Sequence, residues 1–300
     1  TDEIIREAIR VSMSGTPGPS YIEYPHHTVL EELDVPEALP PHRYRLTMQG
    51  ADGDRVAEAV EMIAKAKNPV ILAGHGVYTS KSGAAVKDLA LKIGAPVIQT
   101  SGGTAFIKGI EDRTFPYGFS EVSIDAVVES DLCIALGTEL GEPSHYGRWR
   151  HWVDNEANRK WIYVQQDPTA IGVNREIDCP LVGDLRAVVP QLVRALEGKT
   201  LPGHPRLEEF MKGDAQQIKD LDEESQTRDD GTGNVAMNTA RFIVEATKAF
   251  PKDGIMIRDG GATVIYTWTY NMAKPHDVIW NQNYGHIGTG LPYATGAMLA

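Results

Sequence analysis

PVILAGHG, at residues 69–76, is the stretch of sequence that decides the fold. Its first five residues form an uninterrupted apolar run that stops at a glycine, which is typical of a strand covered on both faces of a parallel sheet. Similar runs occur at residues 95–99, 131–136 and 160–165, with a shorter one at 181–182. Helical patterns lie at residues 54–66, 83–93 and 185–196, and another ends at 126–129. This alternation predicts an α/β fold with a doubly wound, Rossmann-like parallel sheet.

The composition excludes several classes of partner. The chain has 300 residues and a formal net charge of −12, and an acidic surface repels the phosphates of nucleic acids. We therefore expect no nucleic-acid partner. No apolar run is long enough to cross a bilayer, so we expect no membrane association either. Cys133 and Cys179 each lie near an apolar run, which favours buried thiols in a reducing cytoplasm over a disulfide.

The segments on either side of this sheet indicate further units. Residues 26–50 and 198–233 are polar, with prolines or acidic groups, and are typical of connections between domains. Outside the sheet we expect helices at 2–13, 207–221 and 238–250, and strands at 20–24, 254–258 and 278–280. The first residues are already helical and residues 291–300 carry no helix stop signal, so we expect a piece of a longer polypeptide.

The string GHIGTGLPYATGA, at residues 285–297, carries the strongest chemical signal. Gly285, Gly288 and Gly290 permit positive φ and the close approach of a ligand to the backbone. Pro292 fits the start of a helix. A strand, a glycine-rich turn and a helix N-terminus together predict a pocket for a nucleotide or phosphate group. A tight turn with a purely structural role is the alternative.

An ordered set of strings resembles the thiamine-diphosphate-dependent enzymes related to acetolactate synthase, pyruvate decarboxylase and benzoylformate decarboxylase. The strings are GTPGPSYIEYP (15–25), NPVILAGHGV (68–77), GAPVIQTSGGTAFI (94–107), SDLCIALGTEL (130–140), IRDGGA (257–262) and the glycine-rich string above. The resemblance implies the tail of a pyrimidine-binding domain at 1–28, a linker at 29–50, a central Rossmann-like domain at 51–198, a second linker at 199–233, and the start of a diphosphate-binding domain at 234–300.

The resemblance also implies roles for single residues. Gly260, Gly261, Ala262 and Thr263 match the turn beside the diphosphate, and Gly285, Ile287 and Gly288 match the turn beside the two cofactor rings. The Gly285 carbonyl would receive the amino group of the aminopyrimidine. Ile287 would wedge between the rings and bend the cofactor, with a plain core isoleucine as the alternative. His286 lies between them and is the catalytic candidate facing substrate, unless it is a structural histidine.

The implied activity is the formation or cleavage of a C–C bond beside a carbonyl group. The resemblance implies thiamine diphosphate and Mg²⁺ as cofactors, a 2-oxo acid or aldehyde as substrate, and a homodimer or homotetramer in the cytoplasm. The activating Glu and the metal ligands of the family would lie upstream of Thr1 and beyond Ala300. We therefore expect the 300 residues alone to be inactive. Some relatives place FAD or ADP in the central domain, where the Gly74-His75-Gly76 turn could line a pocket.

One departure from the family leaves other functions open. Acetolactate synthases carry an Arg-Phe-Asp-Asp-Arg-like string associated with flavin, which residues 137–149 replace here. The aromatic and basic side chains that follow could clamp a ligand or form an exposed packing loop; they are Tyr146, Arg148, Trp149, Arg150 and Trp152. The competing functions are a non-catalytic module that binds FAD, ADP or NAD, and an inactive regulatory homologue.

Overall fold

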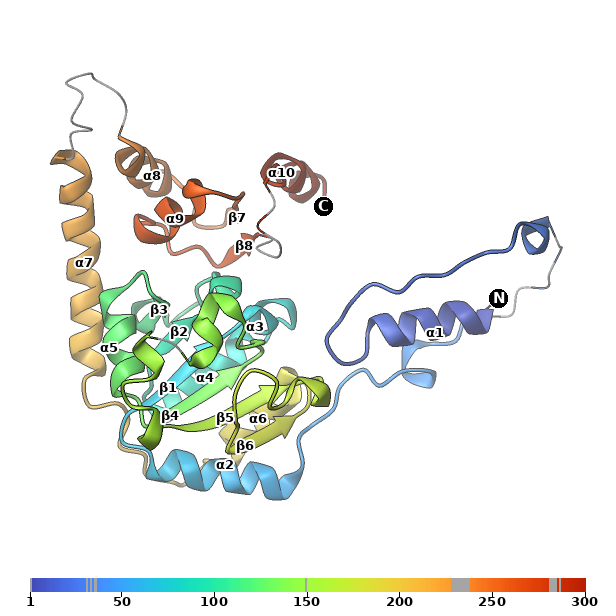
Figure 1. Cartoon of the computed structure of the whole chain (residues 1–300), viewed down its shortest axis with the longest axis horizontal. Helices are drawn as coiled ribbons and strands as arrows, with labels where there is room; N and C mark the ends of the chain where they lie inside the picture. The colour runs from blue at the N-terminus through green and yellow to red at the C-terminus, as the bar shows by residue number, and fades with distance from the viewer. Residues whose placement is uncertain are drawn as a thin grey trace.

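A six-stranded parallel sheet forms the centre of the protein (Figure 1). The computed structural model describes residues 2–30, 32, 34, 37–148, 150–227, 238–280, 285 and 287–300. The strands are β1 (Pro69–Ala73), β2 (Val97–Gln99), β3 (Thr114–Pro116), β4 (Leu132–Leu136), β5 (Lys160–Gln165) and β6 (Cys179–Val182). Their order is β3-β2-β1-β4-β5-β6, and every neighbouring pair is parallel. The predicted doubly wound α/β fold is confirmed.

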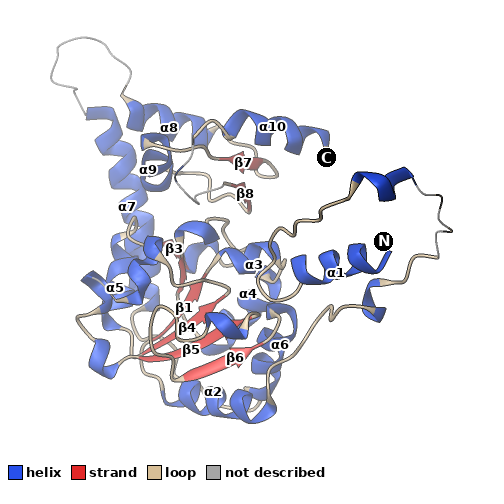
Figure 2. Ribbon diagram, turned by 45° about the vertical axis from the view of Figure 1, so that its right-hand side comes forward, coloured by secondary structure: helices blue, strands red, loops and turns tan. Residues whose placement is uncertain are grey.

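Helices cover both faces of the sheet (Figure 2). On one face, α2 (Gly53–Lys65), α4 (Gly83–Ile93) and α6 (Leu185–Ala195) enclose an aliphatic core. On the other face lie α5 (Glu121–Glu129) and α7 (Leu207–Thr227), with an aromatic core of tryptophan, tyrosine and phenylalanine side chains. Because both faces are covered, the residues of β1 and β4 are buried without alternation.

The chain adds β2 and β3 on one side of β1 and then crosses from β3 to β4 on the other side of β1. The edge where β1 and β4 end side by side is therefore the topological switch point, where doubly wound sheets bind ligands. The short helix α3 (His75–Thr79) follows β1 at this edge. Single-turn 3-10 helices lie in the other connections: η3 (Ser101–Gly103), η4 (Glu111–Arg113), η5 (Glu142–Gly147), η6 (Arg150–Trp152), η7 (Glu156–Asn158) and η8 (Pro168–Ala170).

A second, smaller α/β unit follows α7. It contains α8 (Thr239–Lys248), β7 (Ile255–Ile257), α9 (Ala262–Thr269), β8 (Asp277–Ile279) and α10 (Gly290–Leu299). Strands β7 and β8 pair in parallel. The connection before β8 contacts the central unit: the Phe106 amide donates to the Pro275 carbonyl at 2.8 Å, and Lys274 pairs with Asp214 at 2.9 Å. The red and brown elements in Figure 1 therefore lie against loops of the central sheet.

The N-terminal segment extends to one side of the central sheet (Figures 1 and 2), and its Gly15–Thr16 turn contacts Asp167 in the loop after β5. It consists of α1 (Asp2–Ser12) and the short turns η1 (His26–Leu30) and η2 (Pro41–Arg43), joined by extended chain. No residue of α1 is buried. The predicted strand at 20–24 is wrong: these residues are not in a strand, because no other strand of the described chain lies beside them to accept the ladder hydrogen bonds.

Several other expectations need correction. The three-residue strand β3 and the helix α9 were not predicted, β6 is longer than residues 181–182, and α7 continues past residue 221. The reading of the aromatic and basic segment as an exposed loop is wrong for Trp152, which is fully buried. Trp149 lies outside the described residues, as does the side chain of Arg150. Cys133 and Cys179 are free and buried, as expected.

Candidate functional site

The turn after β7 contains four of the predicted site residues. Gly261 has φ 71° and ψ −155°, a conformation that is essentially restricted to glycine. Gly261 is the N-cap of α9, and the Thr263 hydroxyl donates to the Gly260 carbonyl at 2.7 Å. The first amides of α9, at Ala262 and Thr263, have no acceptor within their own helix. The turn therefore presents backbone donors at the positive end of a helix.

Asp259 connects this turn to the second predicted turn. One carboxylate oxygen accepts the amides of Gly260 at 2.7 Å and Gly288 at 2.8 Å, and the other accepts the amide of Gly290 at 2.9 Å. The amides of Gly290 and Gly288 are the main reason why the pKa of Asp259 is lowered. Asp259 was not among the predicted site residues. Its position directly before Gly260-Gly261 was the available signal, since carboxylates favour helix N-termini.

The second turn displays its central side chain to the outside. Gly285 and Gly288 have φ values of 58° and 92°, so both adopt conformations that favour glycine. Ile287 is 73% exposed among the described residues, and its place beside the cofactor stays a prediction. His286 lies outside the described residues, and its catalytic role stays a prediction. The hydrogen bonds of Asp259 therefore bring the two groups of predicted cofactor residues together, and the exposed side chain of Ile287 lies between two glycines with positive φ.

A buried arginine precedes the first turn. Arg258 is 4% exposed, and its Nε and Nη1 atoms have no hydrogen-bond partner among the described residues. Burial lowers the pKa of Arg258 to about 10, which still leaves it charged at neutral pH. Its guanidinium lies 5.9 Å from the centre of the Trp268 ring. The backbone donors at the start of α9 fit an anionic group such as a diphosphate at the Gly260–Thr263 turn. Within the described ranges, no group of three or more His, Cys, Asp or Glu side chains forms a metal site.

The glycines of the Gly74-His75-Gly76 turn have a structural explanation. A Cβ atom on Gly74 would overlap the Gly137 carbonyl, and one on Gly76 would lie 2.8 Å from the Gly137 Cα. These glycines therefore allow the loops after β1 and β4 to pack together at the switch point. The His75 Nδ1 atom contacts the Gly102 carbonyl at 3.0 Å, which ties the same turn to the loop after β2.

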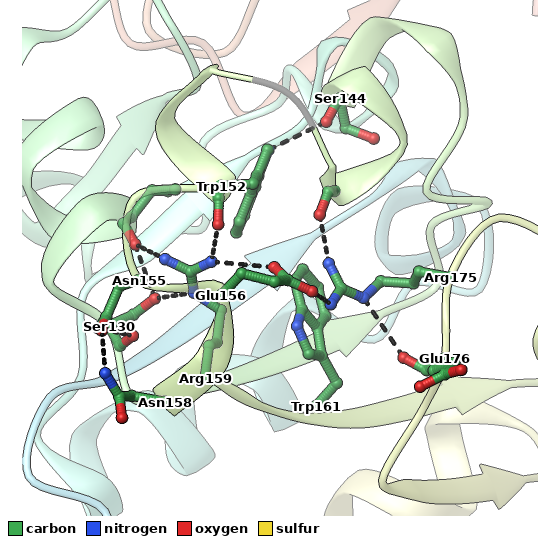
Figure 3. Close-up of polar contacts among 12 residues, drawn as sticks. Ser130, Ser144, Trp152, Asn155, Glu156, Asn158, Arg159, Trp161, Arg175 and Glu176 are labelled. Atoms are coloured by element: carbon green, nitrogen blue, oxygen red, sulfur yellow. Dashed lines mark hydrogen bonds and ion pairs between the residues drawn. The ribbon is translucent and has the colours of Figure 1, made fainter.

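A cluster of arginine and tryptophan side chains supports the loop that follows β4 (Figure 3). The Arg175 guanidinium lies 3.8 Å above the ring of Trp161 and donates to the Gly147 carbonyl and to Glu156. Trp152 donates from Nε1 to the Ser144 carbonyl at 3.0 Å. The neighbouring segment contains two non-glycine residues with positive φ, His145 and Tyr146. The cluster therefore holds a strained loop in place and is part of the core.

Comparisons with known proteins agree with the fold. Residues 56–192 match the family described as "Thiamine pyrophosphate enzyme, central domain". This segment is similar to the central domain of thiamine pyrophosphate enzymes. An acetolactate synthase of Mycobacterium bovis is 30% identical, over 67% of this chain and 32% of its own length. Oxalyl-CoA decarboxylase of Escherichia coli is 24% identical, over 98% of this chain and 51% of its own length.

The thiamine pyrophosphate enzyme relatives are longer than this chain. The similarity covers 33% of a probable acetolactate synthase large subunit of Methanococcus aeolicus, at 28% identity and over 65% of this chain. The chain therefore spans about a third to a half of the length of the curated relatives it matches. Among the helices that the structure describes, none is both long and apolar enough to cross a membrane.

Proposed function

We propose that this chain is the middle part of a thiamine-diphosphate-dependent enzyme that forms or cleaves a C–C bond beside the carbonyl of a 2-oxo acid or aldehyde. The observation that carries the proposal is the pairing of two glycine-rich turns through Asp259, with Ile287 projecting from the second. The family of residues 56–192 and the similarity to acetolactate synthases and an oxalyl-CoA decarboxylase support it.

The proposal assigns each segment a part in the enzyme. We assign residues 1–28 to the end of a pyrimidine-binding domain and 51–198 to the central domain, with a linker at 29–50. Residues 234–300 would begin the diphosphate-binding domain after a second linker at 199–233. The ligands of Mg²⁺ and the carboxylate that activates the cofactor would then lie outside the 300 residues.

The proposed roles follow from the geometry of the two turns. When bound, thiamine diphosphate supplies a centre that stabilises a carbanion beside the substrate carbonyl. The turn at Gly260, Gly261, Ala262 and Thr263 would hold the diphosphate through the amides of its last three residues, because the Gly260 amide donates to Asp259. Ile287 would support the bend between the cofactor rings, and Gly285 and Gly288 would give it room. Asp259 would position the second turn without touching the cofactor, and His286 would exchange protons with substrate.

A further part of the proposal concerns assembly. The smaller unit exposes large apolar side chains at Ile265, Ile287, Leu291, Met298 and Leu299. Apolar surface of this kind marks an interface. We propose that another subunit or domain covers it in a homodimer or homotetramer. The free thiols of Cys133 and Cys179 favour the cytoplasm.

We do not assign FAD or ADP to the central unit. The glycines that suggested such a pocket are explained by the packing of the Gly74-His75-Gly76 turn on Gly137. No observation favours a non-catalytic nucleotide-binding module or an inactive homologue over the enzyme.

The proposal is tested with the full-length gene product that contains these residues. We expect turnover of 2-oxo acids to require both thiamine diphosphate and Mg²⁺, and to disappear when the protein is stripped of them. Gel filtration with light scattering would report the assembly state. Turnover that persists in the stripped protein, or a full-length protein that does not bind thiamine diphosphate, would refute the proposed function.

A further inference from the structure

Lys274 is the first of three consecutive residues that attach the smaller unit to the central unit. It lies in the connection between α9 and β8. Its ammonium group pairs with Asp214 of α7 at 2.9 Å and donates to the Glu111 carbonyl at 3.1 Å. The side chain of Asp214 is 8% exposed and also accepts the Ser120 hydroxyl at 3.1 Å. Because this carboxylate is largely desolvated, removal of its charged partner would leave a buried charge unpaired.

The two residues that follow Lys274 add contacts with the central unit. The Pro275 carbonyl accepts the Phe106 amide at 2.8 Å, and the His276 ring contacts a carboxylate oxygen of Glu111 at 2.6 Å. The Lys274 ammonium group also lies 5.5 Å from the centre of the Phe106 ring. Backbone and side-chain contacts together therefore fix this connection on the loops of the central sheet.

The backbone of Lys274 has a conformation that depends on these contacts. Its φ is 47°, which is uncommon for a residue other than glycine. Such a conformation costs free energy and persists where the surrounding structure holds it. A glycine would adopt this φ without strain, but it would lose the ion pair with Asp214. The strained lysine therefore indicates that its side chain has a role at this position.

The attached connection leads directly into the strand that precedes the second cofactor turn. β8 begins at Asp277, and residues 285–288 follow it in the sequence. β7 pairs with β8 in parallel and leads to Asp259 and the Gly260–Thr263 turn. Both cofactor turns therefore follow the carboxyl ends of these two strands, and a shift of β8 along β7 would change the distance between the turns.

We propose that Lys274 is a positioning residue for cofactor binding. It holds the start of β8 on α7 and on the loop at Glu111, and it thereby keeps the second turn at the distance from the first that thiamine diphosphate requires. The inference rests on the proposed function and deepens it, because it makes the central unit the support that places one of the two cofactor turns.

The test uses the full-length gene product, with calorimetry for the affinity of thiamine diphosphate in the presence of Mg²⁺ and steady-state kinetics for kcat. We expect Lys274→Met to lower the affinity about tenfold, as when one molecule in ten keeps the second turn in place. Saturating cofactor selects these molecules, so kcat should stay close to that of the natural protein. In the cofactor-free protein, hydrogen exchange should become faster at residues 277–279 and stay unchanged in β1.

Three further variants separate positioning from a general loss of stability. Lys274→Arg keeps the positive charge and should keep most of the affinity. Lys252→Met removes an exposed lysine of the same unit and should change neither affinity nor exchange. The double substitution Lys274→Met with Asp214→Asn removes both charges of the ion pair and should show the same loss of affinity. It decides the question if Lys274→Met alone does not fold.

Unchanged affinity in a folded Lys274→Met variant, or unchanged exchange at residues 277–279, would overturn the inference. An equally large loss in Lys274→Arg would also overturn it, because the charge of the side chain would then not matter. If the natural protein bound no thiamine diphosphate, the proposed function would fail, whereas hydrogen exchange would still show whether Lys274 holds β8.

Discussion

Removal of the Arg159 side chain should destabilise the central unit strongly. Its guanidinium is fully buried and donates to the Ser130 hydroxyl at 2.8 Å, to the Val127 carbonyl at 2.7 Å and to the Trp152 carbonyl. It also lies 5.4 Å from the centre of the Trp152 ring (Figure 3). The substitution Arg159→Ala removes all of these contacts at once.

The size of the stability loss depends on which hydrogen-bond donors each carbonyl keeps in the Arg159→Ala variant. The Val127 carbonyl still accepts the hydroxyl of Ser130 at 2.8 Å, whereas the Trp152 carbonyl loses the donor recorded for it. A buried acceptor without a partner costs about 1–3 kcal/mol, and two lost methylene groups cost about 0.8 kcal/mol each. Burial lowers the pKa of Arg159, so the loss of a poorly solvated charge offsets part of this cost. We expect a net loss of about 3 kcal/mol in the free energy of unfolding, at the lower end for broken buried ionic networks.

Urea unfolding at neutral pH, followed by circular dichroism, measures this change. With a denaturant slope of about 1–3 kcal/mol per molar, the midpoint should fall by about 1–3 M. Arg194→Ala is the matched control, because Arg194 is exposed on α6 and should leave the midpoint unchanged. A loss below about 1 kcal/mol for Arg159→Ala would refute the view that this cluster holds the loop after β4.

Three further predictions concern other parts of the chain. Burial lowers the pKa of His204 from 6.5 to about 4, so its stabilising effect is present above pH 6.5 and is lost as the pH falls towards 4. Urea unfolding at stepped pH should show a loss of about 3 kcal/mol over that range, and His204→Phe should not show it. Gly261→Ala should lower the free energy of unfolding by about 1–3 kcal/mol through backbone strain alone, since a Cβ there meets no atom within 4 Å. Thermal melts would measure this loss, and Gly296→Ala in α10 should be neutral or stabilising in the same melts. Asp259→Asn should speed hydrogen exchange at residues 288–290 but not in α2, and unchanged exchange would contradict the proposed anchor.

The central sheet could be predicted because its strands carry continuous apolar runs. The runs of β1, β4 and β5 are buried along almost their whole length, so local composition and final environment agree. The strand β3 could not be predicted, since it has only three residues and ends in a proline. Helix α9 was missed because its sequence, ATVIYTWT, is rich in β-branched and aromatic residues that favour strands.

The candidate site was predicted only in part. Gly261, Gly285 and Gly288 could be predicted because each has a positive φ, a conformation that favours glycine. The role of Asp259 could not, because it depends on hydrogen bonds to residues 29 and 31 positions away. The burial of Trp152 was missed for a similar reason: it packs 5.2 Å from Trp161, and its carbonyl accepts from Arg159. Long-range contacts of this kind leave no local pattern.

The affinity of the full-length gene product for thiamine diphosphate, with Mg²⁺ present, tests the central claim most directly. It should be measured by calorimetry for the natural protein, for Ile287→Ala and for Ile255→Ala. Ile255 is the control, because it starts β7 and the Gly260–Thr263 turn follows the other end of that strand. If Ile287 packs against the cofactor, losing most of its side chain costs about 2 kcal/mol, or about thirtyfold in affinity. We predict that loss for Ile287→Ala and almost none for Ile255→Ala. An Ile287→Ala variant that binds and turns over like the natural protein would contradict the account.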